Sequence, residues 1–128
     1  MIRFTIPNAR LLVVDDLATN LKVAEGLLAP YKVTVDTCMN GAEAIELVKR
    51  RDYDLVFMDH MMPEMDGIET TEIIRGLGKP CFKTIPIIAL TANAVSGMRE
   101  MFLEKGFNDF LAKPIDVSKL DEIGRAHV

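Results

Sequence analysis

The sequence has few cysteines, no excess of basic residues and no long apolar run. Only Cys38 and Cys81 occur among the 128 residues, and no CxxC pair is present. We therefore expect two reduced thiols that serve in packing, with a disulfide between them as the alternative. A net charge of −4 at pH 7 leaves no basic surface for nucleic acid. The longest uncharged run, residues 84–98, is too short and too polar to cross a bilayer.

These absences, together with the lack of a visible signal peptide, predict a cytoplasmic protein without a membrane segment. A length of 128 residues and a hydrophobic content of 49% predict one folded domain rather than a disordered chain. Residues 1–9 are interpreted as a lead-in or linker, because Pro7 and Asn8 favour a turn.

Short apolar runs alternate along the chain with amphipathic segments. We expect strands over residues 10–15, 32–37, 55–59, 85–90 and 108–112, with the second at a sheet edge. We expect helices over residues 18–29, 41–51, 66–75, 96–105 and from 117 onward, with Asn40, Asp66 and Asp116 as N-caps. This alternation with short connections predicts an α/β fold built on one parallel sheet with right-handed crossovers.

The last helix is expected to be short. Val117, Leu120 and Ile123 would form its buried face, and Gly124 falls where another apolar residue would continue that face. The domain is accordingly predicted to span residues 10–123, followed by a tail over 124–128 that could be of artificial origin.

Polar residues stand at four of the predicted strand ends: Asp15 and Asp16, Asp59, Thr91, and Lys113. The carboxyl ends of parallel strands share one edge of the sheet, where such folds bind ligands. Three carboxylates there need counter-charge, of which a lysine supplies part and a hard cation such as Mg²⁺ the rest. A lysine, a hydroxyl and a metal directed at one carboxylate suit phosphoryl chemistry. Asp59 would be the nucleophile and would form an acyl phosphate.

Each of these residues has a plainer interpretation when taken alone. Single acids are more often turn residues or helix caps, and a strand-end threonine or lysine is usually only solvated. Their joint placement on one side of the sheet favours a site. His60 and His127 have no metal-ligand spacing, so they are interpreted as surface or turn residues. Asp66 is better explained as a helix cap than as a ligand.

Taken together, these motifs resemble a response-regulator receiver domain of two-component signalling, from about residue 10 to residue 123. The matching residues are Asp15-Asp16, Asp59 followed by Met62-Pro63-Glu64-Met65-Asp66-Gly67, Thr91-Ala92, and Lys113-Pro114. The resemblance implies a single doubly wound (βα)5, flavodoxin-like three-layer sandwich with strand order 2-1-3-4-5. It also implies that Asp59 is phosphorylated from a phosphohistidine.

By the same resemblance, Asp15, Asp16, Asp59 and the backbone carbonyl of Met61 would surround Mg²⁺ or Mn²⁺. The cation would have oxygen ligands throughout, some of them water.

The resemblance also assigns roles on the phosphoryl side of the site. Thr91 and Lys113 would bind the phosphoryl oxygens, and the Lys113-Pro114 bond is expected to be cis. Phe110 would be the switch aromatic, turning inward when Thr91 is drawn toward the phosphoryl group. Taken alone, Phe110 is more simply a core residue.

Two positions depart from the commonest receiver pattern. Leu17 follows the acidic pair where a polar residue is frequent, which should not disturb the metal. Met61 stands where many receivers carry a polar residue near the attacking water. Since a thioether cannot orient that water, we expect a long-lived phosphorylated form unless Asn93 compensates.

The stretches around residues 3–10, 16–21 and 91–94 resemble receivers of hybrid sensor histidine kinases. The fragment is not expected to be an independent enzyme beyond its own phosphorylation and dephosphorylation, although a hybrid parent would be a histidine kinase. Expected partners are a histidine kinase or a histidine phosphotransfer protein, with the domain a monomer or weak dimer. The alternative is a stand-alone single-domain regulator.

Two other classes of protein fit the sequence less well. A haloacid-dehalogenase-type aspartyl-phosphate phosphatase needs an acid two residues after its nucleophile, where this chain has Met61 or Leu17. A flavodoxin-like flavin binder needs a hydroxyl-rich phosphate loop after the first strand, where Asp15 and Asp16 would repel a phosphate.

Overall fold

The computed structural model describes residues 8–92, 95 and 97–128. In this part of the chain five strands form one parallel sheet in the order β2-β1-β3-β4-β5. The strands are β1 (Arg10–Val14), β2 (Thr34–Cys38), β3 (Leu55–Asp59), β4 (Ile87–Thr91) and β5 (Asp109–Ala112). The helices are α1 (Ala18–Leu28), η1 (Ala29–Tyr31), α2 (Gly41–Arg50), α3 (Gly67–Arg75), α4 (Pro80–Thr84), α5 (Met98–Glu104) and α6 (Val117–His127). The predicted doubly wound fold and strand order are confirmed.

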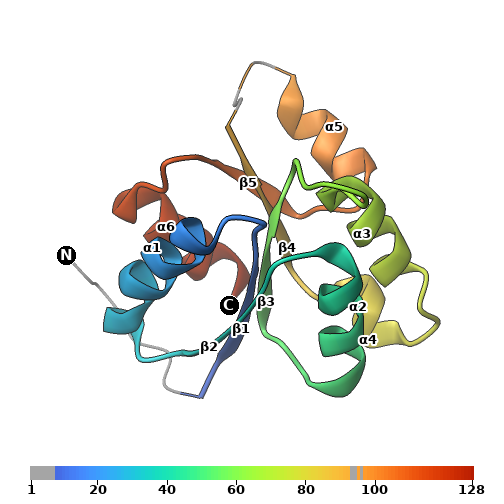
Figure 1. The fold of residues 1–128 in the computed structure, drawn as a ribbon, viewed down its shortest axis with the longest axis horizontal. Helices are drawn as coiled ribbons and strands as arrows, with labels where there is room; N and C mark the ends of the chain where they lie inside the picture. The colour runs from blue at the N-terminus through green and yellow to red at the C-terminus, as the bar shows by residue number, and fades with distance from the viewer. Residues whose placement is uncertain (1–7, 93–94, 96) are drawn as a thin grey trace.

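Helices cover both faces of the sheet, with α1 and α6 on one side and α2, α3 and α4 on the other (Figure 1). Successive strand residues point to opposite faces and so supply two cores. In β3, Val56 and Met58 join one core while Leu55 and Phe57 join the other. This two-sided burial explains why every residue of β3 is buried and why its sequence does not alternate.

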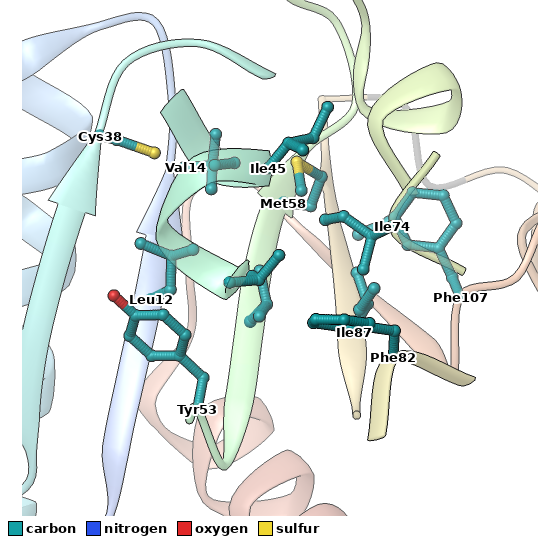
Figure 2. Packing of buried hydrophobic residues seen from close by; sticks show 14 of the residues in the cluster. Leu12, Val14, Cys38, Ile45, Tyr53, Met58, Ile74, Phe82, Ile87 and Phe107 are labelled. Carbon is teal, nitrogen blue, oxygen red and sulfur yellow. The ribbon is translucent and has the colours of Figure 1, made fainter. Parts of the chain in front are cut away.

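Figure 2 shows the core on the α2 side, where strand residues such as Leu12 and Met58 meet Ile45 and Ile74 from the helices. Leu12, Met58 and Ile74 are fully buried. Burying one such side chain stabilises the fold by about 1.5–3 kcal/mol relative to leaving it exposed. These contacts fix the positions of the strands relative to one another, and therefore the positions of the polar residues at the strand ends.

Three helices begin at the predicted N-caps. The side chains of Asn40, Asp66 and Asp116 accept backbone N–H groups at distances of 2.8, 2.9 and 2.8 Å, from Glu43, Glu69 and Ser118 respectively. Each cap of this kind contributes about 1 kcal/mol. The cap at Asp66 starts α3 directly after the turn that follows Asp59.

The expectation of a short last helix was wrong, since α6 continues through Gly124 to His127. Val117, predicted to face inward, is 37% exposed. Asp121 is buried instead, and its carboxylate accepts hydrogen bonds from the Tyr31 hydroxyl at 3.1 Å and Arg125 Nε at 2.8 Å. A helical glycine costs only about 1 kcal/mol, which these polar contacts can offset.

The helix α4 was not predicted; it lies between the helix predicted over residues 66–75 and the strand predicted over 85–90. Pro80 occupies its first turn, where a missing N–H costs nothing. The half-buried guanidinium of Arg75 then fixes the segment by donating to the carbonyls of Phe82 and Ile85 at 3.0 and 2.7 Å. Elsewhere the predicted boundaries shift by a few residues at most. The start predicted for α5, Ser96, lies outside the described residues.

Candidate functional site

The predicted polar residues do meet at one edge of the sheet. Asp15 follows β1, while Asp59 and Thr91 are the last residues of β3 and β4. Since β3 lies between β1 and β4, Asp59 occupies the centre of this edge. Lys113 follows β5 and reaches back across β4 toward Asp59.

Three carboxylates form a close cluster here. One oxygen from each of Asp15, Asp16 and Asp59 lies within 4.8 Å of the others. Asp15 and Asp59 are buried, with 0% and 3% of their surface exposed, whereas Asp16 is half-buried. Burial of like charges at this spacing requires positive charge nearby.

Lys113 supplies part of that charge. Its Nζ lies 2.9 Å from Asp15 Oδ2 and 2.8 Å from Asp59 Oδ1. The Lys113-Pro114 peptide bond is cis. Thus one ammonium group lies between two carboxylates, with a third carboxylate beside them.

The charge balance is visible in the pKa values. Burial raises the pKa of Asp59 to about 6, and Asp16 and Asp15 add to this against the opposing effect of Lys113. Burial opposes charge on Lys113, yet its hydrogen bonds to Asp59 and Asp15 outweigh that effect and raise the pKa of Lys113. The cluster remains short of positive charge. Its hard oxygen donors fit Mg²⁺ or Mn²⁺, which take few carboxylates and keep several waters.

Asp15 is held by contacts that the sequence analysis missed. The Leu17 N–H donates to Asp15 Oδ1 at 3.0 Å, and Asn20 Nδ2 lies 3.3 and 3.2 Å from the two oxygens. An amide in the first turn of the helix that follows an acidic pair is a signal that could have pointed to Asn20. Leu17 itself is 55% exposed, so its side chain lies outside the cluster.

Gly67 sets the position of Asp59 from the other side. Its N–H donates to the carbonyl of His60 at 2.9 Å, so the turn after β3 closes on the first residue of α3. A Cβ atom at Gly67 would overlap the carbonyl oxygen of Asp59. The helix can therefore approach the strand end this closely only with glycine at this position.

Thr91 and Phe110 lie on the side of the site toward α5. Thr91 is buried, while Phe110 is half-buried and stacks on Phe102 with ring centroids 5.8 Å apart. His60 does lie in the turn, as interpreted, but its role there is larger than predicted. Its Nδ1 is 3.4 Å from Thr91 Oγ1, and its ring meets Phe102 edge-on at 5.1 Å.

The side chains of Met61, the two cysteines and His127 make none of these contacts. The Met61 side chain is 70% exposed, and Asn93 lies outside the described residues. Both cysteines are free thiols; burial raises the pKa of Cys38 to about 12, whereas Cys81 is exposed. His127 Nε2 is 3.4 Å from Asp109 on β5, away from the carboxylates.

The sequence matches the family model of the response regulator receiver domain over residues 11–124. The chain belongs to this family. This receiver domain is 41% identical over 110 residues to the signal transduction histidine-protein kinase BarA of Escherichia coli K12. That match covers 86% of the chain but only 12% of BarA, so the chain spans a small part of this relative.

Two solved receiver structures are also similar. The receiver domain of sensor histidine kinase PA1611 from Pseudomonas aeruginosa, described with a magnesium ion coordinated in its active site cleft, is 36% identical with a TM-score of 0.83. The match covers 94% of this chain and 97% of that one. A co-crystal structure of the Saccharomyces cerevisiae phosphotransfer protein Ypd1 with the Ssk1 receiver domain gives 28% identity and a TM-score of 0.80. It covers 92% of this chain and 87% of the other.

No helix in the described part of the chain is both long enough and apolar enough to span a membrane.

Proposed function

We propose that this receiver domain is the phosphoacceptor of a two-component phosphorelay and that Asp59 carries the phosphoryl group. The observation that carries the proposal is the contact of Lys113 with both Asp15 and Asp59 inside a buried carboxylate cluster. A lysine that serves only to neutralise buried carboxylates would balance their charge. Here one ammonium group faces three carboxylates, so the cluster keeps a net negative charge at a strand end.

In the proposed reaction, an oxygen of the Asp59 carboxylate attacks the phosphorus of a phosphohistidine. The new O–P bond makes an acyl phosphate as the N–P bond breaks, and the departing imidazole nitrogen keeps the electron pair. The Lys113 ammonium and the Thr91 hydroxyl bind the phosphoryl oxygens and offset their negative charge. Positioning and charge neutralisation therefore account for most of the catalysis.

Asp15, Asp16 and Asp59 are the residues that would hold Mg²⁺ or Mn²⁺, together with the backbone carbonyl of Met61. When bound, the cation supplies the positive charge that three carboxylates and a phosphoryl group require. Asn20 and the Leu17 N–H hold Asp15 in one orientation for this role.

We propose that the signal leaves the site through Thr91 and Phe110. Attraction of the Thr91 hydroxyl to the phosphoryl group would shift the equilibrium toward a state in which Phe110 turns further inward. The surface of α5 and β5 would change as a result, and a partner protein or the parent kinase would detect that change.

The proposed phosphodonor is a histidine kinase or a histidine phosphotransfer protein, as suggested by the Ypd1–Ssk1 receiver complex. The exposed apolar side chains of Leu17 and Val23 lie on or beside α1 and are suited to docking such a partner next to Asp15. We further propose a cytoplasmic domain, monomeric or weakly dimeric, that belongs to a hybrid histidine kinase. A stand-alone regulator is the alternative, and the full-length gene would separate the two. The family match disfavours the phosphatase and the flavin binder.

The test is intact-mass spectrometry after incubation with acetyl phosphate, with and without Mg²⁺. We expect one added phosphoryl group in the native protein with Mg²⁺, and none in Asp59→Asn or without Mg²⁺. An adduct that persists in Asp59→Asn would contradict the assignment of Asp59. No adduct and no binding of beryllofluoride, a phosphoryl analogue, in the folded native protein would contradict the proposed function.

The lifetime of the phosphoryl group tests the role of Met61. We expect Met61→Asn to shorten the half-life of the phosphorylated protein, because an amide can orient the attacking water whereas a thioether cannot. Asn93→Ala shows whether Asn93 shares that role. An unchanged half-life in Met61→Asn would overturn the interpretation of Met61.

A further inference from the structure

His60 follows the proposed phosphoacceptor directly. Its ring contacts Thr91 of the proposed switch and also Phe102, which stacks on Phe110. The backbone of His60 donates to the carbonyl of Leu90 at 2.8 Å, which ties the turn after β3 to β4. The ring then lies between the Thr91 hydroxyl, 3.4 Å from Nδ1, and the ring of Phe102. Its position is thus fixed by the strand pairing and by two side-chain contacts.

Phe102 extends this contact to α5 and β5. It is fully buried, and it packs edge-on against His60 and Phe107 with centroids at 5.1 and 5.2 Å. On another side it stacks on Phe110 at 5.8 Å with an interplanar angle of 29°. Aromatic pairs at these separations contribute about 0.5–1.5 kcal/mol beyond simple burial, so moving one ring affects its neighbours.

We infer that His60 is a positioning residue that holds the Thr91 hydroxyl in the unphosphorylated state and couples its movement to Phe110 through Phe102. The inference rests on the proposed function and adds a residue to the proposed switch. At 3.4 Å the contact between His60 and Thr91 is longer than an ordinary hydrogen bond, so it is weak. A phosphoryl group on Asp59 can therefore draw the Thr91 hydroxyl away from His60. The contact can form in either tautomer of the histidine, because a hydroxyl both donates and accepts.

Two substitutions separate the two contacts of the ring. His60→Phe keeps a ring against Phe102 but removes the polar atom that faces Thr91. His60→Asn keeps a polar atom near the place of Nδ1 but removes the ring. Tyr53→Phe is the control, since it also removes one polar atom from a buried ring, at the opposite end of β3.

The first measurement is NMR of the Thr91 methyl and Phe110 ring signals in protein without metal or phosphodonor. In His60→Phe we expect both signals to move toward their positions in native protein bound to Mg²⁺ and beryllofluoride. In His60→Asn the Thr91 signal should stay near its native position. A native-like Thr91 signal in His60→Phe would overturn the inference, and so would equal displacement of that signal in both variants.

The second measurement follows the response to the phosphoryl analogue. We expect the Phe110 signal of His60→Asn to move less than half as far as in native protein when beryllofluoride binds. With acetyl phosphate, His60→Phe should phosphorylate about twofold faster, the lower end of what one hydrogen bond contributes, because the lost contact is long. Tyr53→Phe should match native protein in both assays. A full Phe110 response in His60→Asn would contradict the coupling through Phe102.

Failure of the proposed function would be recognised separately. If native protein took up neither acetyl phosphate nor beryllofluoride, the proposed function would fall. The contact between His60 and Thr91 would still be tested in unliganded protein. The measure is how far the Thr91 methyl signal moves in His60→Phe compared with His60→Asn.

Discussion

Asp36 and Asp59 are both strand aspartates with little exposed surface, yet their surroundings are opposite. Asp36 Oδ2 accepts from Arg10 Nη1 at 3.1 Å, Arg51 Nη1 at 2.9 Å and the Tyr53 hydroxyl at 2.7 Å. Burial acts to raise the pKa of Asp36, but these hydrogen bonds outweigh it, and the pKa is lowered. Asp36 is therefore a satisfied structural anion.

Asp59 has one cationic partner and two acidic neighbours. Burial raises the pKa of Asp59 to about 6, with Asp16 and Asp15 contributing and Lys113 opposing. Missing counter-charge, rather than burial alone, therefore distinguishes Asp59 from Asp36. Around Asp36 the protein supplies two arginines and a hydroxyl, whereas around Asp59 it supplies Lys113 for three carboxylates.

The largest effect is expected for Lys113→Met. Removing the ammonium leaves Asp15 and Asp59 buried with less counter-charge, so the free energy of unfolding should fall by about 3 kcal/mol in EDTA. Millimolar Mg²⁺ should restore part of that loss by binding the folded state. Urea unfolding measures both.

Lys119→Met is the matched control for that variant. Lys119 is exposed, and its ion pair with Glu122 is long, at 3.9 Å. Its loss should therefore change the free energy of unfolding by less than about 0.5 kcal/mol. Equal effects of the two lysine substitutions would contradict the distinction between the site and the surface.

The next largest effect is expected for Gly67→Ala, which alters the site without touching a charge. The added methyl group would overlap the Asp59 carbonyl, so the strand end and helix must separate at a cost of about 2 kcal/mol. Gly26→Ala in α1 has nothing within 4 Å of its new methyl group and should instead stabilise by about 0.5–1 kcal/mol. Thermal or urea unfolding of the pair measures the difference, and a shared sign would show that the close approach does not matter.

Asparagine substitutions at Asp59 and Asp36 should change the free energy of unfolding in opposite directions. In EDTA at pH 7 we expect Asp59→Asn to raise the free energy of unfolding by about 1–2 kcal/mol, because it relieves the carboxylate cluster. Asp36→Asn should lower it by about 1–2 kcal/mol, because three donors lose a charged acceptor. Urea midpoints determine both signs, and stabilisation by Asp36→Asn would remove the basis of the comparison.

The pH dependence comes last, because it is the gradual loss of that same benefit at Asp59, about 2 kcal/mol between pH 7 and pH 4. The folded pKa of Asp59 is about 6 against an ordinary 3.8, so folded protein binds the proton more tightly and the penalty at Asp59 declines as pH falls from 6 to 4. The benefit of Asp59→Asn should shrink over that interval in EDTA. The folded pKa of Asp36 lies below 3.8, so the cost of Asp36→Asn should persist to pH 4 and decline only below it. A benefit of Asp59→Asn that is constant from pH 7 to pH 4 would contradict the raised pKa.

The sequence by itself determined the elements and their polar ends. Fully apolar runs such as 55–58 require a sheet covered on both faces, and the short connections require parallel strands. The side chains that cap helices act within three residues, so Asn40, Asp66 and Asp116 were predictable from local spacing alone. Asp15, Asp59 and the other strand-end residues follow from the same logic, because parallel strands align their carboxyl ends.

Only the tertiary structure decided the contacts between residues far apart in the chain. The meeting of His60 with Thr91 and Phe102, and the anchoring of Asp121 by Tyr31, join residues whose local sequence carries no sign of the partner. The same holds for Gly67, whose need for glycine arises from the approach of α3 to the end of β3. Local periodicity and capping act over a few residues, whereas close packing and shared charge depend on which elements the folded chain brings together.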